Sequence, residues 1–150
     1  MKIKSLQHSF VKFIPKTLDE GVLYVSIEYC TAAHNCVCGC GNRVVTPISP
    51  TDWRLLFDGE TVSLSPSIGN WGFECQSHYW IKQSKIEWAG KWKKEQINAG
   101  RNKDFQDKKE YFKQKDAEIL GQEIESKVES TIKSNQKKGF WERLLNKLGL

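Results

Sequence analysis

The chain has 150 residues, of which 39% are apolar and 27% are charged, and its formal net charge is +5. This size and composition suit one domain with a modest core and a more polar part beside it. No apolar run approaches the roughly 18 residues that a membrane span requires, and no signal-peptide segment follows the basic start. We therefore expect a cytoplasmic protein without a membrane span, whose thiols stay reduced.

Charge divides the chain into two parts. Residues 1–90 carry eight basic and eight acidic side chains, whereas residues 91–150 carry fifteen and ten. The neutral first part argues against nucleic-acid binding, because nucleic-acid readers present a basic patch. Together with the change of composition after Gly90, this predicts a domain at 1–90 and a charged extension at 91–150.

Short apolar and β-branched runs, separated by turn formers, predict about seven short strands before residue 90 and no helix among them. The Asp58-Gly59 pair between two runs predicts an antiparallel hairpin, and a short turn at Gln83-Ser84 joins the last two runs. Segment 65–72 has many turn formers and is expected to be a shaped loop. The sequence therefore predicts a mainly β, antiparallel first domain, with strands at 10–14, 22–29, 43–46, 53–57, 61–65, 78–82 and 85–88.

The composition of the second part, residues 91–150, predicts a helix. This part is rich in Lys, Glu, Gln and Ala and lacks proline. Apolar residues recur every four positions from Leu120 to Ile132, on one drifting helical stripe that is expected to pack against the β domain, another copy or a partner protein. Gly139 is expected to end this helix. A last short amphipathic helix is then expected, with an apolar face made by Phe140, Trp141, Leu144, Leu145 and Leu148.

Four of the five cysteines and two of the three histidines lie in two short segments, 34–41 and 75–78. Thiols at this density, with Gly39 and Gly41 between them, indicate a Zn²⁺ site, which needs four ligands at about 2.0 to 2.3 Å. An extended run would hold its outer sulfurs about 13 Å apart, so we expect a turn at Gly39. Disulfides are disfavoured because the count is odd and the closely spaced cysteines cannot pair without strain.

Six side chains compete for the four metal positions. The set predicted first is all thiolate, and the alternative set replaces Cys36 with His78. Either set leaves at least one histidine that lies beside the metal but is not one of its ligands. The first set is Cys36, Cys38, Cys40 and Cys75; the alternative is Cys38, Cys40, Cys75 and His78; His34 is the sixth candidate.

Ser67 is a candidate nucleophile, because Pro66, Gly69 and Gly72 allow a rigid loop with free backbone donors. Its base would be His34 or His78; the alternative is that Ser67 only braces a turn.

The other enzymatic option is a zinc-bound water as the nucleophile, with Glu74 or Asp52 as the carboxylate that takes its proton. It is disfavoured because sites with three or four thiolates are usually closed and structural.

Four motifs in order resemble the bacterial domain-of-unknown-function family numbered 6527. They are HNCVCGCG at 34–41, VTPISP at 45–50, SPSIGNW at 65–71 and CQSHYWI at 75–81, and the resemblance covers roughly residues 10–100. Members of that family occur beside bacterial genes for ubiquitin-like proteins and their activating and conjugating enzymes. The resemblance implies a peptidase that trims or releases a ubiquitin-like modifier, within antiviral defence. The family pattern falls on His34, Cys36, Cys38, Cys40, Ser67, Cys75, Ser77 and His78.

Two functions stay open. One is a zinc-stabilised peptidase with a serine/histidine mechanism, and the other is a non-catalytic zinc module that binds a ubiquitin-like protein or its conjugation enzymes. An imidazole within about 3 Å of the Ser67 hydroxyl would favour the peptidase. Histidines that are both coordinated or buried would favour the binding module. The sequence names neither the substrate nor the oligomeric state.

Overall fold

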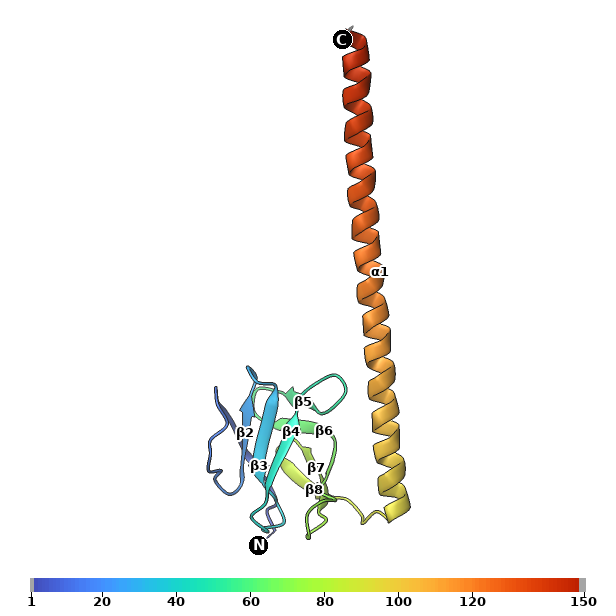
Figure 1. Cartoon of the computed structure of the whole chain (residues 1–150). Helices are drawn as coiled ribbons and strands as arrows, with labels where there is room; N and C mark the ends of the chain where they lie inside the picture. Colours follow the sequence, from blue (N-terminus) through green and yellow to red (C-terminus); the bar gives the residue numbers. More distant parts are fainter. Residues whose placement is uncertain (1, 149–150) are drawn as a thin grey trace. The chain divides into compact units, whose positions relative to one another are not determined.

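The part of the chain that the structure describes forms two four-stranded β-sheets followed by one helix (Figure 1). The computed structural model describes residues 2–148, and in the helix it describes side chains as far as residue 133. The predicted class, mainly β with a helical extension, is confirmed. The elements are β1 (Gln7–Phe10), β2 (Val22–Ser26), β3 (Thr31–Asn35), β4 (Arg43–Pro47), β5 (Arg54–Phe57), β6 (Val62–Gly69), β7 (His78–Lys82), β8 (Lys85–Trp88) and α1 (Lys94–Leu148).

The first sheet has the order β1-β2-β3-β4 and differs from the prediction in two ways. Strand β3 was not predicted, because Ala32 and Ala33 give a weak strand signal; both are fully buried in the sheet. Strand β1 lies before the expected 10–14 and pairs with β2 in parallel, so the domain is not wholly antiparallel. The remaining pairs, β2 with β3 and β3 with β4, are antiparallel.

The second sheet has the order β5-β6-β7-β8, with every pair antiparallel. Both predicted hairpins are confirmed, and at the first turn the Asp58 carboxylate accepts hydrogen bonds from the backbone N–H groups of Glu60 and Thr61. The expected loop at 65–72 is partly wrong, because β6 continues to Gly69. Its register against β7 shifts between Leu64 and Ile68 and then pairs Gly69 with His78. This irregular stretch therefore carries Ser67 beside the start of β7.

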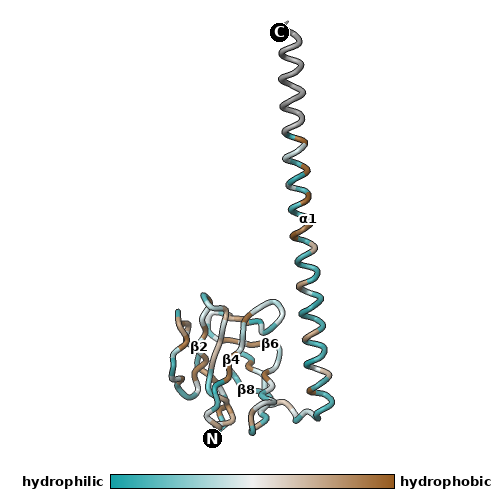
Figure 2. Tube along the Cα trace, in the orientation of Figure 1, coloured by the Kyte–Doolittle hydropathy of each residue, from teal (hydrophilic) through white to brown (hydrophobic). Residues whose placement is uncertain are grey.

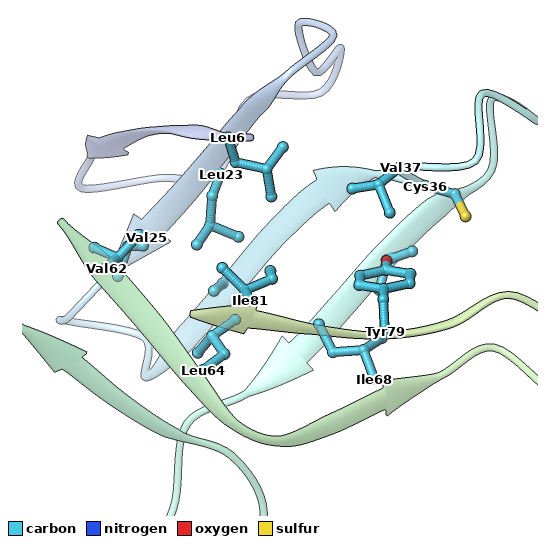
Figure 3. Packing of buried hydrophobic residues seen from close by; sticks show 12 residues of the cluster. Leu6, Leu23, Val25, Cys36, Val37, Val62, Leu64, Ile68, Tyr79 and Ile81 are labelled. Carbon is cyan, nitrogen blue, oxygen red and sulfur yellow. The ribbon is translucent and has the colours of Figure 1, made fainter. Parts of the chain in front are cut away.

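The two sheets share one hydrophobic core (Figure 3). Leu23 and Val25 of β2 meet Leu64 of β6 and Ile81 of β7, and all four side chains are buried. At one end of this core the Tyr79 ring points its hydroxyl group toward the region of Cys36 (Figure 3). The core thus continues directly from apolar side chains into polar and thiol groups.

The chain divides into two compact units, Met1–Asp104 and Phe105–Leu150. Helix α1 starts in the first unit and accounts for the second, and polar residues dominate it where its side chains are described (Figure 2). The predicted break at Gly139 is wrong, since α1 continues to Leu148; one internal glycine costs a helix only about 1 kcal/mol. The apolar face predicted at 140–148 lies outside the described side chains. No helix in the described part of the chain is long and apolar enough to cross a membrane.

Candidate functional site

Two loops bring the cysteine segments together. After β3 the chain turns at Gly39, as predicted: its φ is 84° and its N–H donates to the Cys36 carbonyl at 2.9 Å. Positive φ favours glycine, which explains this residue within the cysteine run. The second loop joins β6 to β7, and it is closed by the Asn70 N–H donating to the Ser77 carbonyl at 2.9 Å. This loop presents Cys75 to the first.

The sulfur atoms of Cys36, Cys38, Cys40 and Cys75 all lie within 4.8 Å of one another. Cys36 Sγ is 3.4 Å from Cys38 Sγ and 4.0 Å from Cys75 Sγ, and Cys40 Sγ is 3.6 Å from Cys75 Sγ. The fifth cysteine, Cys30, is exposed and takes no part in this cluster. The four clustered thiols can hold a metal ion, and they are the all-thiolate set.

Burial and hydrogen bonding shift the pKa values of Cys36, Cys38 and Cys40 in different directions. It raises the pKa of Cys36 and raises the pKa of Cys38 to about 12, whereas backbone hydrogen bonding at Asn42 is the main cause that lowers the pKa of Cys40 to about 7. Metals bind thiolates, so a cation at this cluster must displace protons from the two more basic thiols.

Buried polar side chains lie against the cysteine cluster and form a hydrogen-bonded network. Ser77 Oγ lies 3.1 Å from Cys36 Sγ and accepts a hydrogen bond from Asn70 Nδ2 at 2.8 Å. Asn70 Nδ2 also lies 3.4 Å from the Tyr79 hydroxyl oxygen. Burial raises the pKa of Tyr79, so this phenol stays neutral. The Ser77 and Asn70 side chains can therefore hold a thiolate at Cys36 in place.

His34 lies in this network. Its Nε2 atom is 2.8 Å from the Tyr79 hydroxyl oxygen, and its ring is fully buried, with no hydrogen-bond partner for Nδ1 among the described residues. Burial lowers the pKa of His34 to about 4, so the imidazole is neutral at pH 7. The structure brings His34 to Tyr79 and not to Ser67 or to the sulfur cluster.

Ser67 and His78 form the second arrangement. The Ser67 hydroxyl oxygen lies 2.9 Å from His78 Nε2, and His78 Nδ1 lies 3.2 Å from the carbonyl oxygen of Gly90. Ser67 is half-buried at the end of β6 and His78 begins β7. His78 therefore stands beside the candidate nucleophile, and it is not part of the sulfur cluster.

Three tryptophans surround the His78 ring. The ring centroid of His78 lies 4.9 Å from that of Trp71, 5.6 Å from that of Trp80 and 5.1 Å from that of Trp92. Trp71 and Trp92 stack on each other with centroids 5.7 Å apart. The Trp71 indole also covers Gly69 so closely that a Cβ atom there would lie 2.4 Å from its Nε1. His78 is thereby left only 4% exposed.

The sequence pattern did not single out several of these residues. Asn70 and Trp71 lie within the SPSIGNW motif and Tyr79 follows His78, so the motifs that carry the resemblance contained them. Gly90 was noted only as the boundary of the first domain, and nothing in the sequence pointed to Gly90 or Trp92 as site residues; both lie in the irregular segment between β8 and α1.

The BubE family, described as "Bacterial ubiquitination-like system serine protease", matches residues 10–89, which is more than half of the 150-residue chain. No curated protein and no solved structure matches the chain. The family match supports the association with bacterial ubiquitin-like systems that the four motifs predicted. The chain belongs to the BubE family of serine proteases of bacterial ubiquitination-like systems.

Proposed function

We propose that this protein is a serine peptidase that processes or releases a ubiquitin-like protein, with Ser67 as the nucleophile and His78 as its general base. The observation that carries the proposal is the 2.9 Å distance between Ser67 Oγ and His78 Nε2, which meets the requirement for proton transfer. Of the two predicted histidines, we assign the base to His78 because His34 Nε2 lies against the Tyr79 hydroxyl group.

The reaction follows from this contact. His78 Nε2 takes the proton of the Ser67 hydroxyl group as Oγ forms a bond to the carbonyl carbon of the scissile amide. The carbon–nitrogen bond then breaks, and the leaving amine takes the proton from His78. A water molecule, deprotonated by the same nitrogen, then forms a bond to the acyl carbon; the bond between this carbon and Ser67 Oγ breaks, and His78 returns the proton to Oγ. The peptide bond is hydrolysed without any change of oxidation state.

We propose Zn²⁺ for the sulfur cluster, held by Cys36, Cys38, Cys40 and Cys75. Four sulfurs placed at about 2.3 Å around one tetrahedral ion would lie about 3.8 Å apart, and three sulfur pairs of the cluster lie at 3.4, 3.6 and 4.0 Å. Four protein ligands leave no position for a reacting water, so the ion would be structural. The hydrogen bond of Ser77 to Cys36 fits that role.

The proposal is tested with the ubiquitin-like protein of the same bacterial system, extended at its C-terminus by a reporter protein. The wild-type chain is expected to cut the fusion at one position, read by intact mass. Ser67→Ala should keep its metal and melting temperature and lose at least about 10⁴-fold in rate, as removal of a nucleophile does. Binding of the ubiquitin-like protein with no cutting by the wild type would instead support the non-catalytic module.

A further inference from the structure

The segment between β8 and α1 reaches the His78 ring from the side opposite Ser67. The carbonyl oxygen of Gly90 lies 3.2 Å from His78 Nδ1, while Ser67 Oγ lies 2.9 Å from His78 Nε2. A carbonyl oxygen can only accept a hydrogen bond, so this contact places the hydrogen of the neutral ring on Nδ1. His78 Nε2 is then the unprotonated nitrogen, which is the form that takes a proton from a serine.

Trp92, in the same segment, restrains the orientation of the ring. Its plane stands at 78° to the imidazole with centroids 5.1 Å apart, and it stacks at 20° on Trp71, which contacts the imidazole as well. One hydrogen bond alone would leave the ring free to swing about its side-chain torsions. The two indoles restrict that motion and keep Nε2 directed at Ser67.

The Trp92 ring lies close to helix α1 at Gly100. A Cβ atom added at Gly100, in the second turn of α1, would lie 3.2 Å from Cζ3 of the Trp92 ring. Glycine here is unfavourable for the helix by about 1 kcal/mol relative to alanine, yet it leaves room for the indole. The preceding chain is fixed by the Ala89 N–H, which donates to the His78 carbonyl at 2.9 Å.

We propose that the Gly90 carbonyl group and the Trp92 side chain are positioning groups for His78, and that they complete the active site from outside the family-matched region, which ends at residue 89. This rests on the proposed function. A main-chain carbonyl then takes the orienting role that a carboxylate has in Ser-His-Asp triads. Because Gly100 lies beside Trp92, the first turns of α1 also help to set the position of His78.

The test measures the nucleophilicity of Ser67 without a protein substrate. An alkyl fluorophosphonate reacts with an activated serine: the Oγ–phosphorus bond forms, fluoride leaves, and His78 takes the hydroxyl proton. The labelling rate of the full-length chain is followed by intact mass and the site by peptide mapping. Trp92→Ala should slow labelling about 10- to 100-fold, as a misplaced catalytic group does. Trp92→Phe, which keeps an aromatic ring, should restore most of the rate.

Two control variants separate positioning from folding. Trp88→Ala removes a tryptophan of similar exposure, 39% against 42%, whose ring contacts Tyr79 instead, and it should label at the wild-type rate. Gly100→Ala should slow labelling although alanine favours the helix, because the added methyl group would lie 3.2 Å from the indole and shift Trp92 by a few tenths of an ångström. Gly121→Ala, in open space on the same helix, should not change the rate.

The outcomes distinguish the two proposals. A wild-type chain that is not labelled at Ser67 would overturn the proposed function and this inference with it. Labelling of Ser67 that is equally fast in wild type and in folded Trp92→Ala would overturn the positioning role alone. Should Trp92→Ala fail to fold, the Gly100→Ala and Gly121→Ala pair decides, since equal rates in the two variants would contradict the inference.

Discussion

Ser77 and His78 are neighbours in the chain, but their side chains serve two different centres. Ser77 Oγ lies 3.1 Å from Cys36 Sγ, and His78 Nε2 lies 2.9 Å from Ser67 Oγ. Cys75, two residues before Ser77, belongs to the sulfur cluster. The position of the proposed base is therefore tied to the cysteine cluster through three residues of backbone, although no sulfur takes part in the proposed chemistry.

Metal removal is expected to abolish activity, because the start of β7, which carries His78, would no longer be held by the cysteine cluster. The purified chain should contain about one zinc ion, and Cys75→Ser should lose the metal, a large part of its stability and the labelling of Ser67, because structural zinc contributes directly to folding free energy. Cys30→Ser is the matched control, since Cys30 is exposed and outside the cluster. Metal content, melting temperature and labelling rate are measured. A metal-free chain with an unchanged melting temperature and rate would contradict this prediction.

The fold class could be predicted from the sequence, because the short apolar runs of the first part and the helix formers of the second are local signals. The approach of the four cysteine sulfurs was predicted from the density of cysteines in two short segments, and Ser67 was singled out because glycines and a proline lie in its segment. The contact between His78 and Ser67 depends on the β6–β7 register, which shifts irregularly between Leu64 and Ile68 and which no local pattern predicts.

Long-range packing explains the other differences. Strand β3 has small residues with weak strand preference, and its burial within the first sheet outweighs that preference. The roles proposed for Gly90 and Trp92 rest on their contacts with His78, which lies twelve and fourteen residues earlier, and sequence periodicity gives no signal of these contacts. Helix α1 continues past Gly139 because the surrounding residues favour helix strongly enough to offset one glycine.

His34 should make the stability of the protein depend on pH. Burial lowers the pKa of His34 to about 4, below the 6.5 of an exposed histidine. Between these values the unfolded chain binds a proton that the folded chain does not, so stability rises with pH from about 4 to 6.5 and is fully present above 6.5. The difference across this range should be roughly 3 kcal/mol.

The matched variant for this effect is His34→Gln, which keeps a polar group near the Tyr79 hydroxyl oxygen, the partner of His34 Nε2. It should be less stable at pH 7 but lose less stability on acidification. Because both proteins keep the same four thiols, acid-induced metal loss is common to them, and the difference between their urea midpoints isolates His34. Parallel stability curves for the two proteins between pH 7 and pH 4 would refute the assigned shift.

Gly69 should be needed to hold Trp71 against His78. A methyl group at Gly69 would lie 2.4 Å from Nε1 of Trp71, so the indole must move in Gly69→Ala and leave its contact with the imidazole ring. We expect slower Ser67 labelling, about 10-fold, with an altered tryptophan fluorescence spectrum. Gly72→Ala, where no atom lies within 4 Å of the added carbon, is the control and should match wild type in both measurements. Equal rates in the two variants would show that Trp71 has no positioning role.

Truncation after Asp104 tests which part of α1 the site requires. The first compact unit ends at this residue and contains the sulfur cluster, Ser67 with His78, and the Trp92 contact with Gly100. Residues 1–104 are therefore expected to stay folded, to bind zinc and to label at Ser67 at the full-length rate, since a domain with its own core folds alone. Residues 1–89 keep every strand but lack Gly90 and Trp92, so they should bind zinc and label about 10- to 100-fold more slowly. Loss of labelling in the 1–104 fragment with its fold intact would mean that residues beyond Asp104 contribute to the site.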